Sequence, residues 1–234
     1  MLSERAILWT LLAIAVPSAA TAQTDEIVVT GSRVSGDDYS GIPSVTLQRR
    51  ADFLVQRIRL LNDTRSDELR RKELYQTVHG LLVESAKRPG LALGYGTEFL
   101  VPISEHDYEV PLDSGGKRAD TSSTSIYVKM ALGAKDDVAV SVGVLAAFIK
   151  SARVVGRTEI EPEGEIALSL VGPEKYRYQI ISRIAEDAKK LQATLAAKCH
   201  VHITGLSKRV SWQRSDVSEL TLYIPYNVDL TDCE

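Results

Sequence analysis

Residues 154–195, VVGRTEIEPEGEIALSLVGPEKYRYQIISRIAEDAKKLQATL, decide the fold more than any other stretch of this 234-residue chain. Apolar and polar residues alternate over 154–160 and 166–171, and between them lies Glu161-Pro162-Glu163-Gly164, a sequence typical of turns. This pattern predicts a β-hairpin. Gly172-Pro173-Glu174 then begins a helix, with proline suited to its first turn. The apolar stripe of that helix consists of Ile180, Ile184, Ala188, Leu191 and Leu195.

The chain before this stretch alternates in the same way between strand and helix signals. Residues 45–61 predict a strand with apolar side chains on both faces, which indicates a sheet covered on each side or a bulge that shifts the register. Residues 65–87 predict a helix that ends at Pro89-Gly90. A strand region over 91–103, a polar segment over 104–120 and a strand that contains Ile126, Val128 and Met130 follow.

Residues 137–151 allow two interpretations. A helix capped by Asp136 places Val138, Val142, Leu145 and Ile149 on one stripe. The alternation of Val138, Val140, Val142 and Val144 also fits a strand. We favour the helix, because Ala146-Ala147-Phe148-Ile149 continues only the helical period.

The end of the chain predicts a second hairpin, with strands over 199–212 and 219–229 and a turn over 214–218. Centred on Asp216, this hairpin places Cys199 opposite Cys233, the only two cysteines of the chain. A disulfide between them closes a loop of about 35 residues, which stabilises a fold by about 3–4 kcal/mol. We expect this bridge to be a structural staple.

The order of elements is therefore β-α-β followed by β-α-β-β-α-β-β. This order predicts an α+β fold in which helices pack on a mainly antiparallel sheet. The formal net charge of −3 at pH 7 argues against a nucleic-acid-binding protein, which needs a basic surface.

The first residues predict export. An apolar run over 6–16 follows Arg5, Pro17 ends it, and Ala20-Thr21-Ala22 supplies the small side chains that signal peptidase accepts. We expect a signal peptide over 1–22, cleaved between Ala22 and Gln23, then a flexible leader over 23–43 and a folded domain over 44–234. No later apolar run is long enough to span a bilayer, so a soluble periplasmic protein is expected.

No stretch of the chain indicates a particular reaction or cofactor. His200 and His202 share one face of a strand, a geometry that can present two imidazoles to a metal, but no third ligand is near in sequence. Glu105-His106-Asp107 contains acid–base groups within a polar loop, where charged residues are expected in any case. We therefore expect no catalytic, cofactor-binding or metal site. An enzyme with an unrecognised site stays an alternative.

The succession of elements resembles the SIMPL domain of exported bacterial proteins. The resemblance rests on the strand near 51–61 with the charged helix after it, on Thr124-Ser125-Ile126-Tyr127-Val128-Lys129-Met130, on residues 156–170, and on Ile184-Ala185-Glu186-Asp187-Ala188-Lys189-Lys190-Leu191-Gln192-Ala193. It covers residues 44–214 and implies a periplasmic or envelope protein with no known catalytic site, some of whose relatives oligomerise. The expected function is therefore binding or assembly in the cell envelope, with a homo-oligomer as one form of assembly.

A second resemblance lies in the leader. Glu26-Ile27-Val28-Val29-Thr30-Gly31-Ser32-Arg33 looks like the segment that opens the plug of TonB-dependent receptors. An extended peptide of this kind can add as a strand to the edge of a TonB sheet. This implies an alternative function, that of an accessory protein which engages TonB through residues 26–31.

Overall fold

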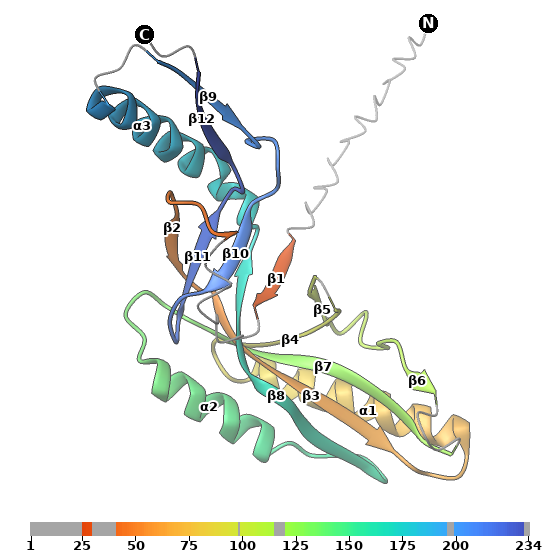
Figure 1. The fold of residues 1–234 in the computed structure, drawn as a ribbon. Helices are drawn as coiled ribbons and strands as arrows, with labels where there is room; N and C mark the ends of the chain where they lie inside the picture. The colour runs from red at the N-terminus through yellow and green to blue at the C-terminus, as the bar shows by residue number, and fades with distance from the viewer. Residues whose placement is uncertain (1–24, 30–40, 98, 115–119, 196–198, 232–234) are drawn as a thin grey trace, which may run out of the picture.

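The computed structural model describes residues 25–29, 41–97, 99–114, 120–195 and 199–231 (Figure 1). The helices are α1 (Asp67–Ala86), α2 (Val138–Lys150), the 3-10 helix η2 (Pro173–Tyr176) and α3 (Arg177–Leu195). The strands are β1 (Glu26–Val29), β2 (Leu47–Arg50), β3 (Phe53–Asn62), β4 (Leu91–Tyr95), β5 (Val101–Pro102), β6 (Asp113–Ser114), β7 (Ser122–Ala131), β8 (Thr158–Val171), β9 (His200–Thr204), β10 (Ser211–Arg214), β11 (Glu219–Tyr223) and β12 (Asn227–Thr231).

The main sheet has the strand order β1-β8-β3-β7-β4-β5, with β6 also paired to β7, and its pairings are antiparallel. Helices α1 and α2 pack on one face of its long central strands (Figure 1). Between them and the sheet lies a core of fully buried aliphatic side chains such as Leu54, Ile58, Leu74, Val128 and Leu145. The α+β class predicted from the sequence is therefore confirmed.

The predicted hairpin over 154–171 is wrong, because β8 is one continuous strand that pairs along β3. The turn-like residues stay in the strand: Glu161, Pro162 and Glu163 lie opposite Arg59, Ile58 and Arg57. Three residues of β8, 164–166, face the single residue Gln56 of β3, so the excess forms a bulge. Gly164 has φ +68° and thereby accommodates that bend at no steric cost.

The double-sided apolar pattern of 45–61 has two structural causes. The chain divides into β2, which pairs with β11 in a second sheet, and β3, which lies in the main sheet. Within β3 the side chains alternate without interruption, since the extra residues of the bulge lie on β8. Leu54 and Ile58 face the helix layer while Val55 faces a separate cluster on the other side, so a sheet covered on each side explains the pattern.

Helices α1 and α2 follow their predicted patterns, with small shifts at the ends. Helix α1 begins after Ser66, whose side chain accepts a hydrogen bond from the Leu69 N–H at 3.4 Å. Helix α2 confirms the helical interpretation of 137–151. Its cap is Asp137, which accepts from the Ala139 N–H at 2.7 Å, while the predicted cap Asp136 accepts from the Gly133 N–H.

The C-terminal hairpin is present but interrupted. β10 pairs with β11 in one sheet and β9 with β12 in another, with Arg214 opposite Leu220 and His200 opposite Thr231. The inner pair centres on Val217, one residue from the predicted Asp216. The outer pair is out of register with the inner one, because 205–210 on one arm and 224–226 on the other differ in length. Helix α3 lies beside the β9–β12 pair, and the Gln192 side chain donates to the Cys199 carbonyl at 3.1 Å (Figure 1).

The described part of the expected leader belongs to the domain. Strand β1 pairs with β8 along Glu26–Val29 opposite 168–171, and Ile27 and Val29 are buried. On its other side, the Leu100 N–H donates to the Glu26 carbonyl at 2.8 Å, so the sheet curls until its two edges meet. The predicted boundary at residue 44 is thus corrected, because burial of two aliphatic side chains stabilises β1 in the sheet.

Candidate functional site

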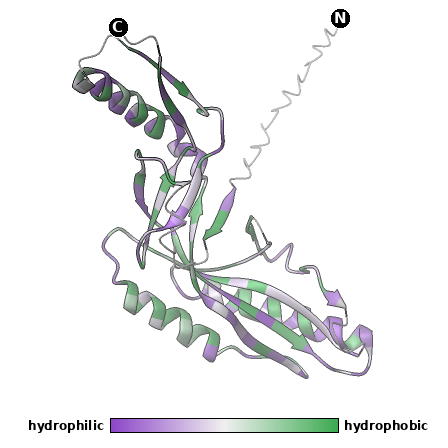
Figure 2. Ribbon diagram, in the orientation of Figure 1, coloured by the Kyte–Doolittle hydropathy of each residue, from purple (hydrophilic) through white to green (hydrophobic). Residues whose placement is uncertain are grey.

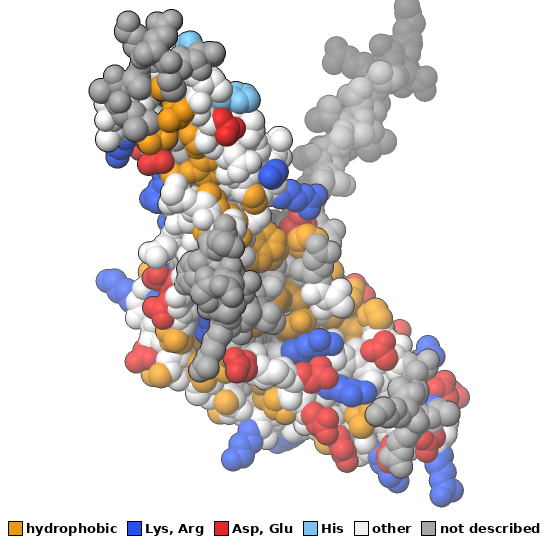
Figure 3. Space-filling model, in the orientation of Figure 1, with side chains coloured by type: hydrophobic (Ala, Val, Ile, Leu, Met, Phe, Trp, Pro, Cys, Tyr) orange, Lys and Arg blue, Asp and Glu red, His pale blue; other side chains and the backbone are white. Residues whose placement is uncertain are grey.

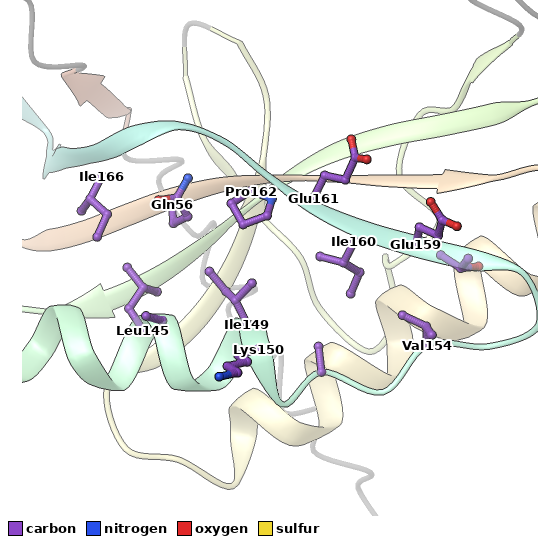
Figure 4. A pocket seen from close by; sticks show the side chains of 13 residues that line it. Gln56, Leu145, Ile149, Lys150, Val154, Glu159, Ile160, Glu161, Pro162 and Ile166 are labelled. Carbon is purple, nitrogen blue, oxygen red and sulfur yellow. The ribbon is translucent and has the colours of Figure 1, made fainter.

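A groove of about 730 Å³ separates the C-terminal half of α2 from the first half of β8 (Figure 4). Side chains from both walls point into it, with Ile149 of α2 across from Ile160 of β8. The groove is lined by Gln56, Leu145, Ala146, Ile149, Lys150, Ala152, Val154, Thr158, Glu159, Ile160, Glu161, Pro162 and Ile166. This mixture of an apolar floor and a few polar groups at the rim is typical of ligand sites.

The α2 wall is apolar because this helix carries no charged residue from Val138 to Ile149. Figure 2 shows α2 mostly in the hydrophobic colours, whereas α3 is mixed. Leu145 and Phe148 are buried in the core, and Phe148 also lies under the Arg88 guanidinium at 5.2 Å. A helix that is apolar on all sides is normally covered on all sides. In this structure Ala146 lies exposed at the groove, and Val140 is 64% exposed on the outer face.

The β8 wall is an open sheet edge. β1 pairs only with residues 168–171 of β8, so within the described ranges no strand lies beside residues 158–166 on the side away from β3. The Thr158 N–H donates to the Val155 carbonyl at 3.2 Å, so the backbone N–H of Thr158 is directed away from β3. The backbone groups of successive strand residues alternate in direction, so residues two apart share one direction. The N–H and carbonyl of Ile160 therefore face the open edge, like the N–H of Thr158.

Pro162 fits this edge. It shares the outward direction of Ile160, so its missing N–H removes no hydrogen bond to β3. Proline and charged residues on a strand limit indiscriminate pairing with other chains. Glu159 and Glu161 are both exposed and supply such charged side chains, on the face of β8 opposite to that of Ile160.

Gln56 lines the groove and donates hydrogen bonds to backbone carbonyl groups beside the bulge. Its amide Nε2 donates to the carbonyl oxygens of Arg57 and Glu163, each at 3.0 Å, and approaches that of Gly164 at 3.4 Å. This side chain is almost fully buried. The Gln56 amide thus ties the two strands together at the bulge, next to the groove.

Glu73 of α1 binds the loop between α2 and β8 through hydrogen bonds. Its Oε2 accepts hydrogen bonds from Asn62 Nδ2 at 2.7 Å, from Thr64 Oγ1 at 2.8 Å and from the Arg157 N–H at 3.2 Å. The bond from Asn62, followed by those from Thr64 and Arg157, lowers the pKa of Glu73 below its usual value. Gly156 has φ +60° here, and a Cβ at this position would lie 2.0 Å from the Glu73 carboxyl carbon.

A second polar cluster lies inside the curl of the main sheet. Lys129 of β7 and Glu26 of β1 form a buried ion pair, and Ser169 of β8 donates to the same carboxylate. The Lys129 ammonium also lies 4.1 Å from the centre of the Phe53 ring. Each charge has its partner, so this cluster fixes β1 in the sheet.

The residues predicted for TonB docking are those of β1 and Thr30. Glu26, Ile27, Val28 and Val29 are paired with β8, and Thr30 lies outside the described residues, as do Ala22 and Gln23. A docking peptide offers free backbone groups to its receptor. Contact with TonB through this segment therefore requires β1 to leave the sheet and separate the buried ion pair.

The other residues singled out from the sequence do not come together in one site. Cys199 is buried and disulfide-bonded, while Cys233 lies outside the described residues. His200 and His202 are exposed on β9, and Figure 3 shows histidine side chains at the surface of this region. Within the described ranges, no three His, Cys, Asp or Glu side chains gather as metal ligands. Glu105, His106 and Asp107 are exposed in the loop after β5.

The groove was not predicted from the sequence, although two signals of it are present there. One is the uncharged run of α2, which exceeds what a one-sided helix requires. The other is a proline and four glutamates within a strand, at Glu159, Glu161, Pro162, Glu163 and Glu165, a composition typical of an edge strand. Because these residues were predicted to form a turn, no open strand edge was predicted there.

Comparisons with known proteins give no family. No family model matches the chain, and no curated protein matches it. A solved structure described as an uncharacterized conserved protein from Listeria innocua is 10% identical, with a TM-score of 0.15, over 82% of this chain and 97% of that chain. A TM-score this low does not show a shared fold. Of the helices that the structure describes, none combines the length and apolar character of a bilayer-spanning helix.

Proposed function

We propose that this chain is an exported, non-enzymatic protein of the cell envelope that acts by binding an apolar partner segment in the groove between α2 and β8. One observation carries the proposal: an apolar groove of about 730 Å³ is walled by a helix that is uncharged from Val138 to Ile149 and by an open strand edge. Most residues that line the groove are aliphatic, and the amide of Gln56 is already engaged in the bulge, which supports binding in place of catalysis.

Two further features support the envelope location. The first residues have the pattern of a cleavable signal peptide. Cys199 is disulfide-bonded, and such bonds persist in oxidising compartments such as the periplasm. The resemblance to SIMPL proteins agrees with binding or assembly in this compartment. The proposal does not include a TonB contact, because the backbone of Glu26–Val29 is already paired.

A tryptophan at Ala146 is expected to fill the groove and abolish binding there. Ala146 is exposed and lines the groove, whereas Ala147 is exposed on the same helix and does not line it, so Ala147→Trp is a matched control. The probe is Nile red, a neutral apolar dye that is excited at wavelengths where tryptophan does not absorb. We expect saturable dye binding by the wild-type protein, binding at least about tenfold weaker in Ala146→Trp, and no change in Ala147→Trp.

Circular dichroism and the thermal midpoint of each variant confirm that the fold is retained. Absence of saturable binding by the wild-type protein contradicts the proposal. Equal loss in the two variants also contradicts it, because the dye would then occupy the outer face of α2.

A further inference from the structure

We propose that the occupant of the groove is an extended polypeptide that adds as an antiparallel strand to the open edge of β8, with alternating apolar and basic side chains. This inference rests on the proposed function and names the chemistry of its partner. The structural basis is the juxtaposition of an unpaired strand edge with an apolar groove beside it. Strand addition uses these two features, main-chain hydrogen bonds for affinity and pockets for alternate side chains.

The open edge supplies a short ladder with one favoured register. Ile160 directs its N–H and carbonyl outward, since it shares the direction of Thr158, whose N–H turns away from β3. Pro162 shares this direction and offers only a carbonyl. A partner residue opposite Ile160 therefore exchanges two hydrogen bonds, and the ladder loses its donor at Pro162.

The groove selects apolar side chains at alternate positions. The side chain of Ile160 points toward α2, because it lies opposite Leu60, which is buried under the helices. In an antiparallel pair, residues directly opposite share one face. The partner residue opposite Ile160 thus directs its side chain into the space bounded by Ile149 and Ile166.

The other face of the added strand selects basic side chains. Glu159 and Glu161 are exposed on that face of β8, and opposite charges on adjacent strands stabilise a pair. Glu163 is already bound to Arg57 at 3.0 Å. Lys150 is the basic residue among those that line the groove, and it lies on α2 (Figure 4). Glu159 and Glu161 lie on β8, on the other wall, where basic side chains of a partner can pair with them.

A second copy of this chain is a poorer occupant. Antiparallel pairing of two β8 edges about Ile160 places Glu159 of each copy opposite Glu161 of the other. Like charges directly opposite are destabilising. The acidic edge therefore favours a basic segment over its own copy.

The test uses the peptide Lys-Val-Lys-Ile-Lys-Val-Lys, labelled for fluorescence anisotropy, with the full protein. In an antiparallel complex the amides of valine and isoleucine face β8, while those of lysine face solvent. We expect N-methylation of the valine and isoleucine amides to weaken binding at least about tenfold, and N-methylation of the lysine amides to leave it unchanged. Replacement of the lysines by glutamate should weaken it to a similar extent.

The variant Glu159→Gln/Glu161→Gln should bind the lysine peptide several-fold more weakly, with less dependence on salt. Binding that survives methylation of the valine and isoleucine amides overturns strand addition. Equal binding of the glutamate peptide overturns the basic partner, as does self-association of the protein through β8 in place of peptide binding. If Nile red binds in the groove and no peptide does, this inference fails while the proposed function stands. If neither binds, both fail.

Discussion

Replacement of Lys129 by methionine is expected to lower the free energy of unfolding by about 3–5 kcal/mol, because it leaves the carboxylate of Glu26 buried without its counter-charge. Both side chains of the pair are almost fully buried, so water does not replace the missing ammonium. The change also removes the contact between the ammonium and the Phe53 ring. Urea denaturation followed by circular dichroism measures the loss.

The double variant Glu26→Gln/Lys129→Met is the control for this prediction. Glutamine keeps a polar group for Ser169 and carries no charge, so the double variant should recover at least half of the stability that the single variant loses. A single variant within about 1 kcal/mol of the wild-type protein would show that the pair is solvated, and the assignment of β1 as a fixed strand would be wrong.

Phe148→Ala is expected to lower the free energy of unfolding by about 3–5 kcal/mol, because it removes a fully enclosed ring and leaves a cavity between α2 and the sheet. This ring is the largest fully buried side chain of α2, so its loss also loosens the helix that forms one wall of the groove. Binding of Nile red should weaken in parallel. Thermal unfolding and dye titration measure the two effects.

Val140→Ala is the matched control on the same helix. Val140 is 64% exposed, so its truncation should change the free energy of unfolding by less than about 0.5 kcal/mol. Similar effects of the two substitutions would show that α2 does not depend on Phe148 for its position.

Periodicity predicted the helices well because their apolar residues follow one face. Leu74, Val78 and Leu81 of α1 are all buried, as are Ile180 and Ile184 of α3. In α2, the run Ala146-Ala147-Phe148-Ile149 continued only the helical period, and the helix was the correct choice. These patterns depend on local spacing, which a single sequence displays directly.

The errors arose where long-range pairing overrode local turn chemistry. Glu161-Pro162-Glu163-Gly164 has the composition of a turn, yet it continues along β3, because the proline faces an open edge and the glycine accommodates a bulge. A single sequence does not show which strand lies beside which. For the same reason the leader residues Ile27 and Val29 were not expected in the sheet, and the groove was not predicted.

Hydrogen exchange at the Ile160 amide tests the central claim most directly. This N–H faces the open edge of β8 beside the groove, and it is the donor that an added strand engages. With the lysine peptide at saturation, we predict exchange at Ile160 at least about tenfold slower than in the free protein, an effect that Ala146→Trp removes. An unchanged Ile160 amide, together with protection on α3 or β9, would contradict the account and place the binding surface elsewhere.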